Sequence, residues 1–413
     1  MNIGIDISTI LNFGVSMGSG RYIINLLNGL FCIAEESRKK SFKENDHEKV
    51  KDPMKSTQDI TFTLTGRYSD DSNLHHINDL ATNYPGLSIK FKLFKYSQDI
   101  IDRWDKRSFP PIELKGFKAD MLHCPDYIVP PTRNKNIILT IHDLSFYRFP
   151  QFNFSWFIQK YQTMVLKNAK RAKLIIADSQ STRQDIINFM KIDPQKIKVI
   201  YLAADKKFKP LPPGELKSSV IKKFNIPKNF ILSVGTIEPR KNFKTLIKAF
   251  NIFRDDYGSS NEYSLVIVGK TGWKSEETFE EYEKSPYKNE IIFTGEADDE
   301  DLVQLYNQAS LFVYPSIFEG FGLPPLEAMS CALPVIATNT SSVPEIYPNE
   351  EFLVNPFDEN IMAQKINLVL SDNKVRERLI NFSIENSKKF SWEKSSLQTM
   401  QVYHQMYDLS FKK

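Results

Sequence analysis

The chain has 413 residues, of which 41% are hydrophobic and 25% charged, with 54 basic against 50 acidic side chains. This composition is typical of a globular protein of roughly two or three domains, and a net charge of +4 is too small to indicate nucleic-acid binding by itself. No hydrophobic run approaches the roughly 20 residues of a membrane-spanning helix. Met1 leads directly into a strand-like run, residues 3–7, without the pattern of a signal peptide. Three scattered cysteines, Cys32, Cys124 and Cys331, lack metal-site spacing and favour a reducing compartment.

Strand-like runs alternate with helical patterns throughout, which predicts parallel sheets built from strand–helix–strand units. In the first half, the predicted strand 3–7 leads to the loop 16–21 and a helix that continues through Leu30. Gly18 and Gly20, at the start of this helix, would let a backbone approach an anionic or sugar ligand closely. A plain turn is the simpler interpretation of two glycines.

Three further features of the first half predict a surface excursion, a ligand-site residue and a possible membrane contact. Segment 35–55 is dense in charge and poor in hydrophobic residues, so we expect a solvated, mobile excursion. His142 directly follows the predicted strand 137–141, at a carboxyl edge where open α/β sheets bind ligands. It could be a general base, a hydrogen-bond donor or a histidine packed under a loop. The basic and aromatic segment 149–173 could lie on an anionic membrane surface, or be a solvated face over an aromatic core.

The proline-rich, charged segment 205–214 has no periodicity and is the predicted domain boundary. The alternation of strands and helices then restarts, so we predict an N-terminal domain, 1–205, and a C-terminal domain, 206–391. The strand ends of two such α/β halves would face each other across a cleft, which is a usual place for a ligand.

Two cations and one carboxylate stand in strand-to-helix loops of the second half, and a second carboxylate stands in the first turns of the helix that follows. Arg240 and Lys241 precede a predicted helix, where both charges and the helix dipole favour a diphosphate. Glu319 and Glu327 flank a glycine–proline turn, and two carboxylates near one loop suit a hydroxyl-rich ligand. Taken singly, Glu327 could simply complement a helix dipole.

A metal-dependent reaction would favour an Asp-x-Asp motif at a strand end. The chain's Asp299-Glu-Asp301 motif opens a predicted helix, where acidic residues serve as caps. The sequence therefore predicts a metal-independent reaction without a cofactor.

Four runs of residues resemble the group 1, GT4-type, retaining glycosyltransferases of the GT-B fold. They are Val234-Gly-Thr-Ile-Glu-Pro-Arg-Lys-Asn242, Val268-Gly-Lys-Thr-Gly-Trp273, Phe293-Thr-Gly-Glu296 and Glu319-Gly-Phe-Gly-Leu-Pro-Pro-Leu-Glu327. Gly18–Tyr22 and His142–Leu144 also match the amino-terminal half of this family. The resemblance implies two Rossmann-like domains facing each other across a deep cleft, an acceptor domain over residues 1–205 and a nucleotide-sugar donor domain over residues 206–391. It also implies a last helix, about 392–413, that packs back on the N-terminal domain.

The resemblance also implies roles for individual residues. Arg240 and Lys241 would bind the donor diphosphate, Glu327 the ribose hydroxyls and Glu319 the hydroxyls of the transferred sugar. His142 would approach that sugar. Further donor contacts would come from the glycine loops and their neighbours: Gly18, Gly20, Gly235, Gly269, Glu296 near the nucleobase, Phe321, Gly322 and Leu323.

The expected activity is transfer of a hexose, best matched by mannose from GDP-mannose, to a saccharide or lipid-linked saccharide acceptor of cell-surface polysaccharide. We expect same-face substitution through an oxocarbenium-like state, with retention of the anomeric configuration. The expected location is cytoplasmic, or peripheral at the inner face of the membrane, with no nucleic-acid partner. Alternatives are a UDP-sugar transferase, a sugar-nucleotide 2-epimerase of the same fold and a binding subunit that has lost activity.

Overall fold

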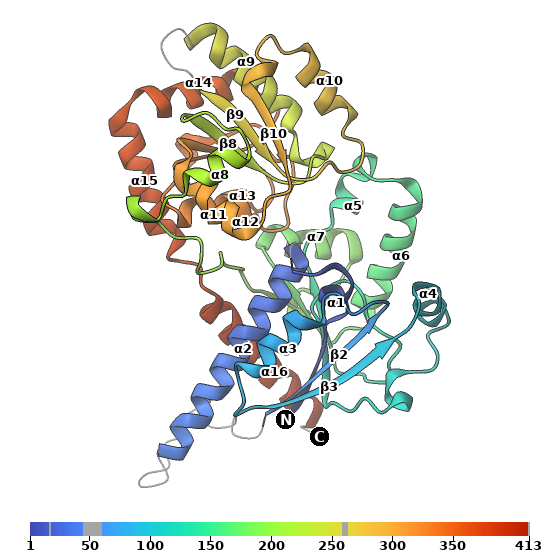
Figure 1. The fold of residues 1–413 in the computed structure, drawn as a ribbon. Helices are drawn as coiled ribbons and strands as arrows, with labels where there is room; N and C mark the ends of the chain where they lie inside the picture. Colours follow the sequence, from blue (N-terminus) through green and yellow to red (C-terminus); the bar gives the residue numbers. More distant parts are fainter. Residues whose placement is uncertain (16–17, 44–59, 258–262, 412–413) are drawn as a thin grey trace.

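Two parallel sheets occupy separate halves of the chain in the computed structural model, which describes residues 1–15, 18–43, 60–257 and 263–411. Figure 1 shows the second half stacked on the first, with both chain ends at the far end of the first half. Most strands are short, largely buried runs, as expected for parallel sheets covered on both faces, whereas the edge strand Ser88–Lys95 is largely exposed or half-buried.

The first half contains, within the described residues, a seven-stranded sheet in the order β3-β2-β1-β4-β5-β6-β7. Neighbouring strands pair in parallel, and β1 pairs with both β2 and β4. The strands are β1 Asn2–Asp6, β2 Thr61–Tyr68, β3 Ser88–Lys95, β4 Met121–Cys124, β5 Ile137–Ile141, β6 Leu174–Ala177 and β7 Ile197–Val199. The helices between them are α1 Ser8–Phe13, α2 Gly18–Lys43, α3 Leu74–Thr82, α4 Gln98–Arg107, α5 Ser145–Arg148, α6 Ser155–Arg171 and α7 Gln180–Met190.

The second half contains, over the same described range, a six-stranded sheet in the order β10-β9-β8-β11-β12-β13, again parallel. Its strands are β8 Phe230–Val234, β9 Ser264–Val268, β10 Ile291–Gly295, β11 Leu311–Tyr314, β12 Val335–Thr338 and β13 Leu353–Val354. Its helices are α8 Ser218–Lys223, α9 Phe243–Tyr257, α10 Glu276–Lys284, α11 Asp299–Gln308, α12 Leu323–Ser330, α13 Val343–Ile346, α14 Glu359–Ser371 and α15 Asn373–Ser387.

The last helix, α16 Trp392–Phe411, returns to the first half and lies beside α2 and β4 (Figure 1). Tyr403 joins it to the sheet, because the Tyr403 hydroxyl lies 2.7 Å from Nδ1 of the buried His123. Ser396 packs against Gly29 of α2 so closely that a Cβ at Gly29 would lie 2.0 Å from the serine Oγ. The chain therefore crosses between the two halves twice, once before β8 and once before α16.

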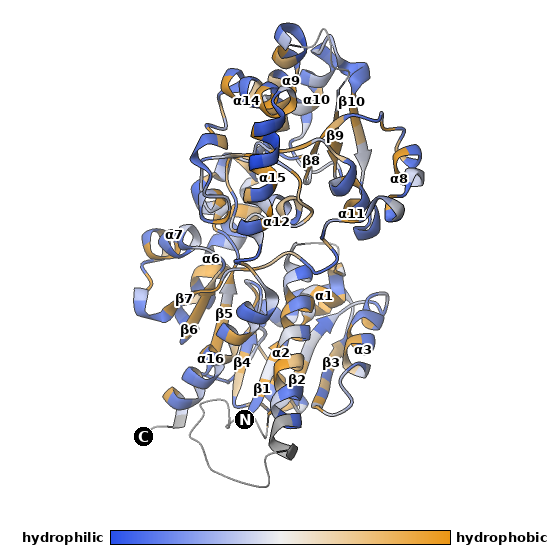
Figure 2. Ribbon diagram, turned by 90° about the vertical axis from the view of Figure 1, so that its left-hand side faces the viewer, coloured by the Kyte–Doolittle hydropathy of each residue, from blue (hydrophilic) through white to orange (hydrophobic). Residues whose placement is uncertain are grey.

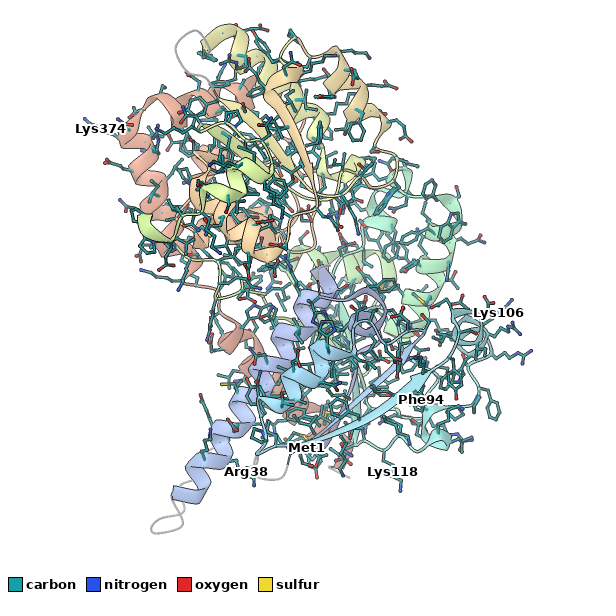
Figure 3. The ribbon with its side chains drawn as sticks, in the orientation of Figure 1. Met1, Arg38, Phe94, Lys106, Lys118 and Lys374 are labelled. Carbon is teal, nitrogen blue, oxygen red and sulfur yellow. The ribbon has the colours of Figure 1, made fainter. Side chains whose placement is uncertain are left out.

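Hydropathy follows these layers. Figure 2 shows largely hydrophobic strands in the first sheet and a strongly hydrophilic α15 on the surface of the second half. Charged side chains project outward at the periphery, as Lys106, Lys118 and Lys374 do in Figure 3. Among the helices of the described part, none combines the length and hydrophobicity that a membrane crossing requires.

One prediction about the first half needs correction. Helix α2 continues to Lys43, into the segment 35–55 that was expected to be an excursion. Its charged residues are compatible with a solvent-facing helix, and Lys39 pairs with Glu35 one turn away at 2.9 Å. Residues 44–59, the rest of that segment, lie outside the described residues.

Candidate active site

The loops that follow the strands of the two halves meet at Gly320. A Cβ at this glycine would lie 2.0 Å from the carbonyl oxygen of His142, so only glycine permits the approach. Ser179, which caps α7, donates its hydroxyl to the Gly320 carbonyl at 2.6 Å. The loop that carries Glu319 is thereby held directly against the loop that carries His142.

Glu319 is the centre of a buried ionic cluster. Its Oε1 accepts from Lys241 Nζ at 2.6 Å and from Ser316 Oγ at 2.5 Å, and its Oε2 accepts from Arg240 Nη1 at 2.6 Å. Lys241 Nζ also donates to the Tyr314 hydroxyl at 3.1 Å. The structure thus brings together three of the four residues predicted to be catalytic.

A fourth charge completes the cluster. Glu238 accepts from Arg240 Nη2 at 2.7 Å, so that two cations face two carboxylates. Burial disfavours ionisation of Glu319, but Arg240 and Lys241 outweigh it and lower its pKa to about 2. Burial lowers the pKa of Lys241, with Arg240 acting in the same direction and Glu319 opposing both. Glu319 is therefore ionised at neutral pH.

Two glycines shape the turn beneath these cations. Gly269 has a φ of 151°, and a Cβ there would lie 2.0 Å from the carbonyl oxygen of Gly235. Gly235 in turn packs against the side chain of Lys241, whose Cδ would be 3.2 Å from an added Cβ. The predicted glycines therefore let the loops that follow β8 and β9 lie close together, and they shape the surface on which Lys241 lies. Arg240 and Lys241 belong to a short 3-10 helix, Pro239–Lys241, and α9 begins just beyond it.

Glu327 lies in a second ionic cluster, which joins the two halves. Its Oε1 accepts from Arg21 Nη1 and its Oε2 from the Tyr306 hydroxyl, each at 3.0 Å. Arg21, in the first turns of α2, also pairs with Asp299, whose other oxygen accepts from Lys207 at 2.8 Å. Burial raises the pKa of Glu327, and Arg21 opposes that shift.

The helix that carries Glu327 starts beside a small pocket between the halves. Gly322 precedes α12 with a φ of 113°, and Leu323, Arg21 and Glu327 line the pocket, whose volume is about 60 Å³. Phe321 is buried, with its ring 6.2 Å from that of Tyr201. Its side chain therefore packs between elements, and its carbonyl oxygen accepts from the Ser342 hydroxyl at 2.6 Å, so any donor contact would be made by its backbone N–H.

His142 has partners for both ring nitrogens. Nδ1 lies 2.7 Å from Asp178 Oδ2, and Nε2 lies 3.2 Å from the carbonyl oxygen of Pro125. Burial opposes the charge on the ring, but Asp178 outweighs it and raises the pKa of His142 to about 9. Both nitrogens then donate, so at neutral pH the ring is an imidazolium and has no free lone pair with which to act as a base.

The remaining predicted residues lie around this centre. Gly18 begins α2, with open space where a Cβ would stand, whereas Gly20 is held against the carbonyl oxygen of Gly14. Glu296 follows β10 with an exposed side chain, 3.8 Å from Lys270. Gly18, Gly20 and Glu296 show no contact with the Glu319 cluster among the described interactions.

Sequence reasoning gave no role to several residues that build the site, Glu238 among them. Asp178 follows β6 as His142 follows β5, so the carboxyl-edge argument could have found it. Arg21 stands in a recognised loop but was given no role. No sequence pattern pointed to Tyr306 or Glu345 as residues of the site. Glu345 accepts from the backbone N–H groups of Gln180 and Ser181, both at 2.8 Å, across the two halves.

No group of three or more His, Cys, Asp or Glu side chains suited to a metal ion occurs among the described residues. The Asp299–Asp301 segment begins α11, and the preceding Asp298 provides the cap by accepting from the Asp301 N–H at 2.8 Å. Asp301 pairs with Lys223. These acids therefore have structural partners.

Comparison with known proteins identifies the two halves separately. Residues 217–386 match the family described as glycosyl transferases group 1, and residues 84–208 match glycosyltransferase family 4. The O-antigen chain mannosyltransferase B of Escherichia coli is 31% identical over 70% of this chain and 75% of its own length. The serotype-specific mannosyltransferase WbdA of E. coli is 35% identical over 55% of this chain, which spans only 28% of that protein.

Solved structures share the architecture. Sucrose-phosphate synthase from Thermosynechococcus elongatus superposes with a TM-score of 0.70 at 18% identity, covering 99% of this chain and 100% of its own. Anabaena HepE in complex with UDP and glucose gives a TM-score of 0.69 at 17% identity, covering 98% and 100%. These likenesses confirm the predicted fold of two Rossmann-like domains.

Proposed function

The chain belongs to the group 1 glycosyltransferases of family 4, and we propose that it transfers mannose from GDP-mannose to a saccharide acceptor in the synthesis of a cell-surface polysaccharide. Its mannosyltransferase relatives support the choice of sugar. The observation that most directly supports this reaction is the buried Arg240–Lys241–Glu319 cluster at the junction of the two halves. The acceptor would be a saccharide or a lipid-linked saccharide.

The cluster can stabilise a departing nucleoside diphosphate. Negative charge grows on the β-phosphate as the glycosidic bond breaks, and preorganised cations in a buried site act strongly on it. Arg240 and Lys241 are held by Glu319 and Glu238, so their side chains are already ordered. When the donor binds, the sugar hydroxyls would donate to Glu319, and the diphosphate would share the two cations. This arrangement supports a metal-independent, same-face substitution with retention.

Glu327 is suited to the donor ribose. An ionised carboxylate offers about four lone-pair sites, and Arg21 and the Tyr306 hydroxyl take one position on each oxygen. Two hydroxyls of a ribose could therefore be bound without breaking either contact. Tyr306 and Arg21 would hold the carboxylate in place for them.

Thermal unfolding with nucleotides tests the donor assignment. A ligand present at 100 times its Kd stabilises the native state by about 2.7 kcal/mol, so GDP and GDP-mannose should raise Tm clearly. UDP and UDP-hexoses at equal concentration should raise it less. A larger shift with UDP would replace the donor with a UDP-sugar, and no shift with either would contradict a nucleotide-sugar enzyme.

Turnover of GDP-mannose by Lys241→Ala tests the proposed leaving-group role. We expect turnover to fall by about 10²-fold or more, since a preorganised charge on the developing anion is lost. Lys244→Ala is the matched control, because Lys244 lies in α9 and, among the described residues, forms its ion pair with the exposed Glu277. Unchanged turnover in Lys241→Ala would contradict the assignment.

Release of GDP by the wild-type protein would exclude an inactive binding subunit, and an epimerised donor would indicate a 2-epimerase.

A peripheral membrane contact is proposed for segment 149–173. Phe154 and Trp156 are 46% and 65% exposed at the start of α6, and the basic residues Lys160, Lys167, Lys170 and Arg171 on the same helix are also exposed. Flotation with anionic liposomes at low salt should carry the wild-type protein upward and Trp156→Ala less so. Failure of the wild-type protein to float would contradict the contact.

A further inference from the structure

The loop between Glu319 and α12 has its carbonyl groups bound by side-chain hydroxyls. Ser179 Oγ, from the first half, donates to the Gly320 carbonyl oxygen at 2.6 Å. Ser342 Oγ lies 2.6 Å from the Phe321 carbonyl oxygen and 3.0 Å from that of Glu319. Three consecutive carbonyl groups therefore have hydroxyl partners, and the serine that binds the middle one belongs to the other half of the protein.

The N–H groups of the same loop are in the opposite situation. Among the described residues, those of Gly320, Phe321 and Gly322 donate to no protein atom, whereas the Glu319 N–H donates to Ser341 Oγ at 2.8 Å. All three residues are buried, and an unsatisfied buried N–H is costly. Successive free N–H groups also form a usual binding site for anions. These groups should therefore receive acceptor oxygens from a ligand.

Helix α12 adds little to this supply of N–H groups. Pro324 and Pro325 stand in its first turn, and proline has no N–H. An anion at this helix start would therefore depend on the N–H groups of the loop. The orientation of the loop peptides decides whether those groups can reach it.

Each peptide of the loop connects a hydroxyl contact with a free N–H. A trans peptide is planar, so its C=O and N–H point in opposite directions. The bond from Ser179 to the Gly320 carbonyl fixes the plane whose other end is the Phe321 N–H, and it strengthens that N–H as a donor by polarising the peptide. Thr182 assists, because its Oγ1 lies 3.2 Å from the same oxygen and 3.1 Å from the carbonyl oxygen of His142.

We propose that Ser179, assisted by Thr182, is a positioning residue for the donor diphosphate. It acts from the first half by orienting the Phe321 N–H, and Ser342 orients the Gly322 N–H in the same way from the second half. The first half thus contributes to diphosphate binding without touching the diphosphate, as long as the halves meet at Gly320. The proposal rests on the proposed function, because it takes the anion to be part of a nucleotide sugar.

Selective labelling can observe the peptide in question. Glycine precedes phenylalanine at two places in the chain, Gly116–Phe117 and Gly320–Phe321. NMR of protein labelled with ¹³C at the glycine carbonyls and with ¹⁵N in phenylalanine therefore reports these two peptides alone. Inorganic pyrophosphate should move the signal of 320–321 and leave that of 116–117, where the Phe117 N–H donates to the Ile112 carbonyl oxygen at 3.2 Å. A 320–321 signal that does not move would overturn the proposal.

Calorimetry of pyrophosphate and GDP binding measures the effect of the hydroxyls. Ser179→Ala should raise the Kd of both ligands about tenfold, the equivalent of one hydrogen bond. Ser342→Ala should act similarly, although its side chain caps no helix. Ser179 also caps α7, so Asp372→Ala, which removes the cap of α15, is the matched control and should bind pyrophosphate as the wild-type protein does.

The outcomes separate the two proposals. A wild-type protein that binds pyrophosphate but not GDP would contradict the proposed donor, and weaker pyrophosphate binding by Ser179→Ala would still support the positioning role. Equal pyrophosphate binding by wild type, Ser179→Ala and Ser342→Ala would overturn that role, as would an equal loss in Asp372→Ala. Thr182→Val keeps the serine cap and should weaken pyrophosphate binding even if Ser179→Ala does not fold.

Discussion

At the scale of single residues, Glu319 explains how two adjacent cations remain ordered in a buried site. Each of its oxygens accepts from one of them, and Ser316 adds a third donor. The same contacts make Lys241 depend on Glu319, because burial lowers the pKa of this lysine and only the nearby carboxylates raise it. The carboxylate therefore controls the charge state of a proposed catalytic group.

Glu319→Gln should move the alkaline limb of activity to lower pH. Without the carboxylate, the pKa of Lys241 falls further, and the ammonium loses its proton at a pH where the wild-type protein keeps it. The pH profile of GDP release from GDP-mannose measures this shift. Glu277→Gln, at an exposed pair, should retain the wild-type profile. A variant profile that is lower at every pH but unshifted would contradict the dependence of Lys241 on Glu319.

His142 gives a prediction about stability rather than rate. Its pKa is raised to about 9 in the folded protein, against about 6.5 in an unfolded chain. The stabilisation is therefore complete below about pH 6.5 and is lost as the pH rises through about 9. Urea unfolding across this window should show falling stability in the wild-type protein and a flatter profile in Asp178→Asn. A profile that falls equally in both would contradict the pairing.

Much of this residue-level arrangement could be predicted, because it follows from parallel sheets. Arg240, Lys241 and Glu319 all follow strands of one sheet, and the carboxyl ends of parallel strands share an edge. The pairing of Arg21 with Glu327 could not be predicted, since it joins residues 306 positions apart on different halves. No local pattern encodes how two separately folded sheets are placed against each other.

At the scale of elements, the amino end of α7 links the two halves. Ser179 caps the helix by accepting from the Thr182 N–H at 3.0 Å, and Glu345 accepts from the N–H groups of the first two helical residues, Gln180 and Ser181. A carboxylate at a helix amino terminus also interacts favourably with the helix dipole. A residue of the second half thus completes a helix of the first.

Glu345→Ala should lower the free energy of unfolding by about 1 kcal/mol, the usual cost of a lost helix cap. It also removes the acceptor of the Tyr201 hydroxyl, which lies 3.0 Å from Glu345 Oε2. Urea unfolding measures the change. Glu345→Gln keeps one acceptor oxygen and should lose less, and Glu350→Ala, in an exposed turn, is a surface control. Equal stability of Glu345→Ala and the wild-type protein would contradict this cap.

Strand positions follow from the sequence pattern more reliably than helix ends do. The predicted strands 3–7 and 137–141 agree with β1 and β5 to within one residue, because short hydrophobic runs between polar loops are distinct. Helix α2 was predicted through Leu30, yet it reaches Lys43. Its last turns carry charged residues without a hydrophobic stripe, so their helical structure depends on continuation from a packed start rather than on burial.

At the scale of the whole molecule, Arg21 connects the proposed ribose site to the arrangement of the two halves. It extends from α2 in the first half to Glu327 and Asp299 in the second. Trp273 provides a second connection at the other side, because its Nε1 donates to the carbonyl oxygen of Phe152 at 2.8 Å. Opening of the two halves would break both connections. Donor binding and the relative position of the halves should therefore be coupled.

Arg21→Ala should weaken GDP binding, and more strongly as the pH falls. Burial already raises the pKa of Glu327, and removing the cation that opposes this shift keeps the carboxyl neutral to higher pH. A neutral carboxyl accepts fewer hydrogen bonds from ribose hydroxyls. Calorimetric Kd values for GDP should therefore diverge between variant and wild type as the pH is lowered. Lys206→Ala, at an exposed pair with Glu393, should behave as wild type. A loss of affinity that does not vary with pH, together with a larger radius of gyration in solution scattering, would instead assign Arg21 to holding the halves together.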